Sequence, residues 1–138
     1  MEYDRQGRLI VCGVVWAELR VLIGEEKLAS FLKDNRIAVE WELTPEVWAA
    51  AAEAFARYLR KRRKSGSLYH CHACGGEIVV SCPQCNTPLG SPRHILPDFL
   101  IGAHALCRAN LLLTADEGIP QKYFPALRVV NPLGPGRK

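Results

Sequence analysis

The sequence contains no apolar run of the roughly 18 residues that a membrane span requires. It also lacks the charged-then-apolar opening segment that is typical of a signal peptide. Its net charge of +4 is small, so the distribution of charge matters more than its total. These absences exclude a membrane-spanning protein and predict a cytoplasmic one without a membrane partner.

The remaining composition is ordinary for a globular protein. A chain of 138 residues with 49% hydrophobic and 23% charged residues has room for one domain with a true core and a small appendage. Four of its six cysteines form two CxxC pairs, whereas Cys12 and Cys107 lie in apolar sequence. In a reducing compartment this pattern favours a metal site and two buried thiols over a disulfide framework.

The stretch from Ile95 to Leu106 predicts a buried helix that begins near Pro97, because proline suits a first helical position. Asp98 falls in the first turn, and the residues one and two turns further on are apolar or small. A carboxylate in such surroundings is costly unless it is compensated, and a metal ion would compensate it. His104, within the same helix, is predicted to be a packed core histidine.

Hydrophobic periodicity predicts further elements along the chain. Strands are expected at 9–12, 37–39, 111–113 and 128–130, and helices at 14–23, 25–35 and 45–64. The long third helix should bury Trp48, Ala51, Ala52, Phe55, Tyr58 and Leu59. On its opposite face, Glu53 and Arg57 are spaced for an ion pair.

Two further acids stand out by their context. Glu18 has valines and leucines at the three- and four-residue offsets of its helix, and the alternative is that it lies at the edge of this stripe and reaches water or pairs with an arginine. Asp116 follows the strand 111–113, and its alternative role is a turn or N-cap acid. Together with Asp98 they form an oxygen ligand set that suits Mg²⁺ or Mn²⁺. Such ions support phosphodiester hydrolysis, so the three acids favour a metal-dependent nuclease.

The two CxxC pairs are separated by seven residues and resemble zinc knuckles. We predict one tetrahedral, structural zinc site with four thiolate ligands. These ligands are Cys71, Cys74, Cys82 and Cys85. Two local disulfides or redox chemistry are the alternatives, and His70 or His72 could replace a cysteine in the ligand set.

A dense basic run ends the long helix. It consists of Arg60, Lys61, Arg62, Arg63 and Lys64. One interpretation is a solvated helix C-terminus, where cations are favoured by the helix dipole. The functional alternative is an RNA-binding contact with the phosphate backbone, which would be independent of base sequence.

Four segments together resemble, in order and spacing, the PIN domain of VapC-type toxins. They are Val14 to Leu19, Asp98 to Ala105, Leu111 to Asp116, and Tyr123 to Pro132. The resemblance implies an α/β fold, a three-layer α/β/α sandwich with a parallel sheet. It also implies a Mg²⁺- or Mn²⁺-dependent endoribonuclease, restrained by a cognate antitoxin and often dimeric. In that family Glu18, Asp98 and Asp116 match acidic metal-ligand positions, and Thr114 matches a neighbouring hydroxyl.

The resemblance also divides the chain and shows two departures. Residues 1–66 and 91–133 correspond to the PIN-like domain, 67–90 to an inserted zinc ribbon, and 134–138 to a tail. Family members begin with a further strand that ends in an acid, and no counterpart precedes residue 9. We therefore expect an open sheet edge. A non-catalytic RNA- or protein-binding module on the same scaffold stays open as the alternative to a nuclease.

Overall fold

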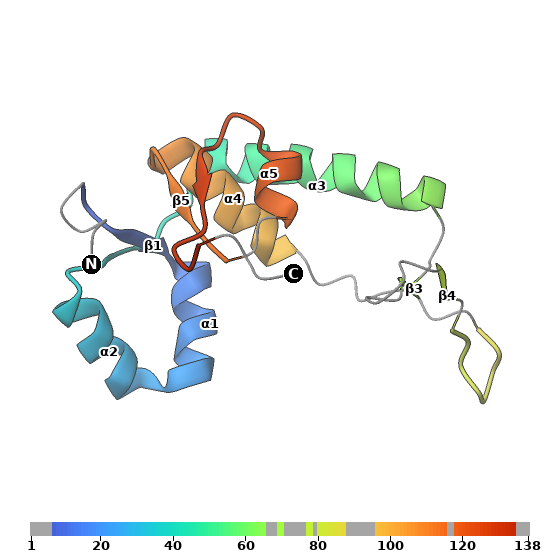
Figure 1. Ribbon diagram of the computed structural model, residues 1–138, viewed down its shortest axis with the longest axis horizontal. Helices are drawn as coiled ribbons and strands as arrows, with labels where there is room; N and C mark the ends of the chain where they lie inside the picture. Colours follow the sequence, from blue (N-terminus) through green and yellow to red (C-terminus); the bar gives the residue numbers. More distant parts are fainter. Residues whose placement is uncertain are drawn as a thin grey trace.

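Helices joined by short strands make up the fold (Figure 1). The computed structural model describes residues 7–65, 69–70, 77–78, 80–87, 96–115 and 118–134. In chain order, the elements are β1 (Ile10–Cys12), α1 (Gly13–Ile23), α2 (Glu25–Asp34), β2 (Ala38–Glu40), α3 (Pro45–Ser65), β3 (Tyr69–His70), β4 (Glu77–Ile78), α4 (Leu96–Arg108), β5 (Leu112–Leu113), α5 (Gly118–Tyr123) and β6 (Val129–Val130). The predicted helices and strands are all present, with ends shifted by a residue or two. Helix α5 was not predicted, because six residues are too few for a helical period to show.

The strands pair two by two. β1 lies parallel to β2 with Ile10 opposite Ala38, and β5 lies parallel to β6 with Leu112 opposite Val129. β3 and β4 form a short antiparallel hairpin in the cysteine-rich segment. Parallel pairs joined through helices are typical of an α/β protein, as predicted. Among the described residues, however, each sheet has only two strands, so one continuous sheet at the centre of a three-layer sandwich is not present there.

The core lies where α3, α4 and α5 meet. The ring of Phe99 in α4 is fully buried and lies 5.3 and 5.6 Å, centroid to centroid, from Phe55 and Tyr58 of α3. Tyr123 of α5 approaches the same ring edge-on at 5.4 Å. Tilted aromatic pairs of this kind contribute about 0.5–1.5 kcal/mol each beyond the area they bury. This aromatic cluster fixes the position of α4 relative to α3 and α5.

The buried face of α3 differs from the predicted one. Val47, Ala51 and Ala54 face the core, whereas Trp48 is 51% exposed and Ala52 is exposed too. The prediction for Trp48 was wrong because its indole N–H donates a hydrogen bond to the Leu43 carbonyl at 3.0 Å, which keeps the ring at the surface.

Two other predictions require correction. The Arg57 guanidinium donates to the Tyr123 carbonyl at 2.8 Å and thereby ties α3 to α5, and no ion pair with Glu53 is present in the described chain. Cys107 is exposed rather than buried, because it lies on the outer face near the end of α4. Cys12 is buried as predicted.

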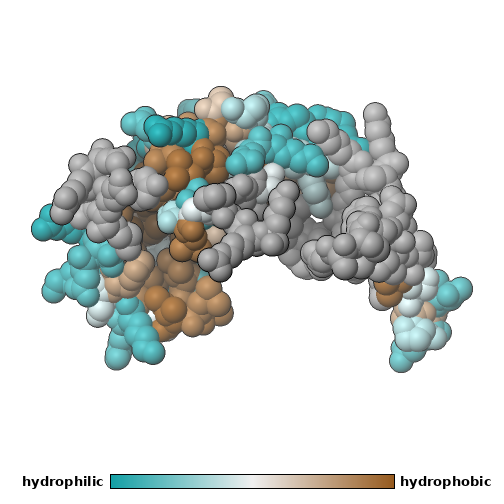
Figure 2. Space-filling view, viewed as in Figure 1, coloured by the Kyte–Doolittle hydropathy of each residue, from teal (hydrophilic) through white to brown (hydrophobic). Residues whose placement is uncertain are grey.

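The first part of the chain is less well covered. Helix α1 contains no buried residue, and Val21 and Leu22 are 87% and 77% exposed. Figure 2 shows this apolar surface in brown over α1. No helix in the part of the chain that the structure describes is long and apolar enough to cross a membrane.

Candidate functional site

Asp98 lies in the first turn of α4 and is half-buried. Its neighbours in the helix, Phe99 and Leu100, are buried in the core, so packing fixes the position of its backbone. Asp98 is not without a partner in the fold, and a carboxylate in this turn is favoured by the positive end of the helix dipole. The predicted start of this helix near Pro97 is therefore confirmed, and the role of Asp98 as a metal ligand stays a prediction.

Glu18 lies on α1, whose chain continues directly from β1. The glutamate is exposed, so the prediction that it is embedded in an apolar face is wrong, and the alternative of a residue that reaches water is correct. The physical reason is that no residue in the described part of the chain buries this side of α1, although its valines and leucines made it look like a buried helix. Helix α1 does pack against α4, the helix that carries Asp98.

Thr114 follows β5 directly and is half-buried. Its backbone N–H donates to the Val130 carbonyl at 3.1 Å, so the end of β5 is fixed by its pairing with β6. Asp116 lies outside the described residues. Among the residues that the structure describes, no cluster of three or more His, Cys, Asp or Glu side chains could hold a metal ion. The three-acid site therefore stays a prediction.

A polar cluster that the sequence did not predict links β2 to α4. One carboxylate oxygen of Glu40 lies 3.0 Å from His104 Nε2 and 3.3 Å from Arg108 Nε. His104 is 5% exposed, as expected for a core histidine, but its partner across 64 residues of sequence was missed. The hydrogen bond from Arg108, together with that from His104, holds the pKa of Glu40 below its ordinary value, although burial opposes this shift. The one available signal was the spacing of His104 and Arg108, which places them on the same helix face.

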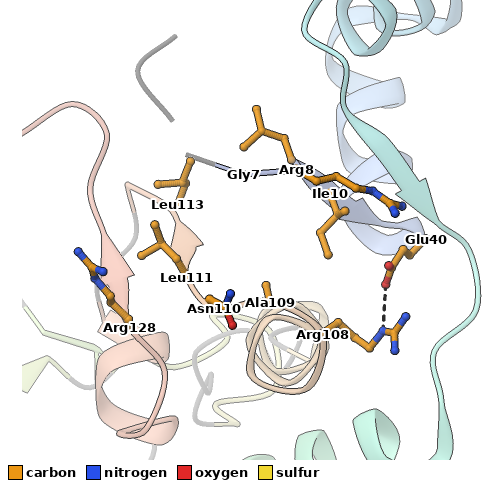
Figure 3. A pocket seen from close by; sticks show the side chains of 11 residues that line it. Gly7, Arg8, Ile10, Glu40, Arg108, Ala109, Asn110, Leu111, Leu113 and Arg128 are labelled. Atoms are coloured by element: carbon orange, nitrogen blue, oxygen red, sulfur yellow. Dashed lines mark hydrogen bonds and ion pairs between the residues drawn. The ribbon is translucent and has the colours of Figure 1, made fainter. Parts of the chain in front are cut away.

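A cleft of about 460 Å³ separates the two parallel sheets (Figure 3). Ile10 lies on one side, and Leu111 and Leu113 lie on the opposite side, with the Glu40–Arg108 ion pair at one end. The described residues that line it are Gly7, Arg8, Leu9, Ile10, Glu40, Arg108, Ala109, Asn110, Leu111, Leu113 and Arg128. The cleft thus combines apolar walls with an arginine-rich margin.

The second cysteine knuckle is described, and the first is not. Cys82 and Cys85 are free thiols on a tight turn that is closed by hydrogen bonds from Cys82 N–H to the Thr87 carbonyl and from Asn86 N–H to the Cys82 carbonyl. The Cys85 thiol lies 3.2 Å from the Thr87 hydroxyl, and this contact, with the Thr87 backbone and the Cys82 thiol, lowers the pKa of Cys85. An easily formed thiolate suits a zinc ligand. Cys71 and Cys74 lie outside the described residues, so the four-cysteine site is untested.

The basic run continues α3 to its end. Arg60 is exposed, and the backbone of Lys61, Arg62, Arg63 and Lys64 is helical, whereas their side chains lie outside the described part. A helix of this length carries its last turns away from the core, as Figure 1 shows for α3. The run is thus placed at a helix C-terminus, which both interpretations of it require.

Three comparisons with known proteins bear on this site. No protein-family model, no curated protein and no solved structure matches the chain. The PIN-domain resemblance of the sequence therefore stays a prediction about family and function. The structure bears on it only through the positions of individual residues.

Proposed function

We propose that the chain is a metal-dependent endoribonuclease with a PIN-like three-layer α/β/α fold, of the kind that acts as the toxin of a toxin–antitoxin pair. The observation that carries the proposal is the placement of Asp98 in the first turn of α4, half-buried and fixed by the aromatic core behind it. Of the other proposed ligand positions, Thr114 directly follows the C-terminal end of the parallel strand β5, and Glu18 lies in the second turn of α1, the helix that follows β1. Strand ends of this kind are the usual place for ligands in α/β proteins.

The donor chemistry of these residues fits Mg²⁺ or Mn²⁺, because Asp98, Glu18 and Asp116 offer carboxylate oxygens and Thr114 a hydroxyl. When bound, such an ion activates a water molecule and stabilises the leaving oxygen of a phosphodiester. The protein's own part is to hold Asp98 in place through the packing of Phe99 and to keep Glu18 accessible to solvent and RNA.

RNA, zinc and protein partners complete the proposal. The exposed Arg60 and the four basic residues after it would contact the phosphate backbone, with an affinity that falls as salt rises. A structural zinc held by Cys71, Cys74, Cys82 and Cys85 would order the inserted ribbon. The exposed apolar side chains of α1 (Val21, Leu22) would be covered by a cognate antitoxin or by a second copy in a homodimer.

A cleavage assay on labelled single-stranded RNA with Mn²⁺ tests the proposal. We expect Asp98→Asn to lower the cleavage rate by at least about 100-fold without changing the circular dichroism spectrum, since removal of a metal ligand affects activity before fold. Glu26→Gln, a change of an exposed acid on α2, is the matched control and should leave cleavage intact. Equal cleavage by the Asp98→Asn variant and the unchanged protein would contradict the proposed site.

The second candidate is a non-catalytic RNA- or protein-binding module on a degenerate PIN scaffold. The separation of the described strands into two-stranded sheets, with a cleft between the two parallel pairs, favours this alternative. It predicts RNA binding that is unaffected by Mn²⁺ and by Asp98→Asn, with no cleavage products. Gel-shift and cleavage assays on the same samples therefore separate the two candidates.

A further inference from the structure

The cleft between the parallel sheets is bordered by two strand edges. On the β1 side, the Ala38 N–H donates to the Leu9 carbonyl at 3.0 Å, so Leu9 and Val11 direct their backbone groups toward β2. Backbone groups alternate in direction along a parallel strand, so the N–H and C=O of Ile10 point away from β2. Ile10 is a cleft residue, and the edge of β1 opposite β2 therefore faces the cleft.

The same alternation applies to β5. The N–H groups of Leu112 and Thr114 donate to the carbonyls of Arg128 and Val130 at 2.9 and 3.1 Å. The backbone groups of Leu111 and Leu113 consequently point away from β6, and both residues line the cleft. Within the described ranges, two unpaired edges thus border one space, and each presents donors and acceptors that another strand could satisfy.

The size of the cleft suits one short strand. A residue in a packed sheet occupies roughly 160 Å³, taking a strand spacing of about 4.8 Å, a sheet spacing of about 10 Å and a rise of about 3.3 Å. The cleft of about 460 Å³ would therefore hold about three strand residues, which matches the three-residue length of β1 and of β2. Its walls of leucine and isoleucine favour aliphatic side chains.

The margin of the cleft is basic. Among the described residues, its lining contains three arginines and one glutamate, and that glutamate, Glu40, is already paired with Arg108 and His104. Arg8 and Arg128 are exposed and form no ion pair with another residue in the described ranges. Charge complementarity therefore favours acidic residues on either side of the aliphatic segment.

We propose that this cleft accepts one β-strand of a partner protein, an aliphatic segment flanked by acidic residues, which would join β1–β2 and β5–β6 into a single sheet. The two edges determine the binding mode, since an occupant would form hydrogen bonds on both of its sides rather than extend one sheet at its border. This interaction goes beyond the ribonuclease proposal and does not depend on it.

The first test uses the full chain and a fluorescein-labelled peptide with a Val-Ile-Val-Val centre and two glutamates at each end. Fluorescence anisotropy should show saturable one-to-one binding. The decisive probes are two N-methylated versions, one methylated at alternate central amides on one edge and the other on the opposite edge. Because a strand between two sheets uses both edges, each version should bind at least about tenfold more weakly.

Variants of the protein give the second test. Leu113→Pro removes an N–H that faces the cleft but spares the bonds of Leu112 and Thr114 to β6, so peptide affinity should fall about 5- to 10-fold. Arg8→Glu and Arg128→Glu should each weaken binding of the glutamate-flanked peptide about 3- to 10-fold and strengthen binding of a lysine-flanked one. Lys27→Glu, on the exposed surface of α2, is the matched charge control and should change neither.

Hydrogen exchange measured by NMR tests the proposal on the unmodified protein, so the result does not depend on whether a variant folds. With the unmodified protein, the peptide should slow exchange of the Ile10 and Leu113 amides together, one on each edge. Protection on one edge alone, loss of affinity with only one of the N-methylated peptides, or equal binding of the lysine-flanked peptide would each overturn the proposal. A homodimer that excludes the peptide and dissociates on Leu113→Pro would also overturn it, because the occupant would then be a second copy.

Discussion

Helices α4 and α1 have similar apolar sequences but different surroundings. In α4, six of thirteen residues are buried, including Phe99 and His104, because α3 and α5 cover it. In α1, none of the eleven residues is buried, and the side chains of Val21 and Leu22 extend into solvent. An apolar helix sequence therefore indicates that the helix can be buried. Whether it is buried depends on a packing partner, either another segment of the chain or another molecule.

In the part of the chain that the structure describes, a polar cluster connects the region of α1 and β2 to α4. Glu40, at the end of β2, contacts His104 and Arg108 of α4. The α1–β2 region thus contacts the core through a charged cluster as well as through packing. Substitutions can separate the contributions of the cluster and of packing to the free energy of unfolding.

The largest expected effect comes from the core side of the comparison. Phe99→Ala removes a fully buried ring that contacts aromatic residues of α3 and α5, and it should lower the free energy of unfolding by about 3–5 kcal/mol. Leu22→Ala, on the exposed face of α1, should stay within about 0.5 kcal/mol of the unchanged protein. Urea denaturation followed by circular dichroism measures the free energy of unfolding of both variants. Similar losses in the two would contradict the difference in burial between α4 and α1.

Close packing in α4 predicts a second, smaller effect. A Cβ atom at Gly102 would overlap the ring of Phe124, so Gly102→Ala should destabilise the protein by about 1–3 kcal/mol despite the better helix propensity of alanine. At Gly13, the first residue of α1, a Cβ would meet Trp41 at an ordinary 3.6 Å, and Gly13→Ala should cause no loss. Thermal unfolding of both variants checks this, and adding Phe124→Leu should restore part of the loss at Gly102. A stable Gly102→Ala protein without that second change would show that the ring can move aside.

The polar connection between the regions predicts a pH dependence. The pKa of Glu40 is held below its ordinary value of 4.5 mainly by Arg108, so the folded state favours the charged carboxylate. The stabilisation is fully present above pH 4.5 and is lost as the pH falls through the lower pKa of the folded protein. Glu40→Gln should cost about 1–2 kcal/mol at pH 7 and flatten the fall of stability below pH 4.5.

A matched control for Glu40 is the exposed pair of Arg20 and Glu25, whose side chains are 49% and 68% exposed. Glu25→Gln should cost less than about 0.5–1 kcal/mol, because solvent screens a surface pair. Denaturation at pH 7 and at pH 3.5 compares the two variants. Equal losses would mean that the Glu40 cluster contributes no more than a surface contact.

The sequence was most informative where local pattern and burial agree. The start of α4 near Pro97, the burial of its apolar residues and the buried His104 all follow from a stripe of apolar residues behind a proline. For Trp48 the same reasoning failed, because neighbouring positions on a helix differ by only about 100° and tertiary contacts choose between them. Here the smaller Val47 was selected for the core.

Pairings between distant segments could not be read from periodicity. Glu40 and His104 are 64 residues apart, and only the fold brings β2 against α4. The division of the described parallel strands into two pairs is likewise a property of tertiary structure. Of the predicted ligand sets, Cys71, Cys74 and Asp116 lie outside the described residues, so both metal sites stay predictions.

The smallest expected effect on stability comes from a substitution on α1. It tests whether the exposed apolar face of this helix lies outside the core. Val21 is 87% exposed, so Val21→Asp desolvates no charge and should change the free energy of unfolding by less than about 0.5 kcal/mol. In α4 the corresponding change, Ala103→Asp, buries a carboxylate at a fully covered position and should prevent folding. If α1 is a contact between copies, Val21→Asp should also convert a dimer to a monomer in sedimentation velocity. A loss of more than about 2 kcal/mol in a protein that is monomeric before the change would instead place Val21 in the core and remove the distinction between the two helices.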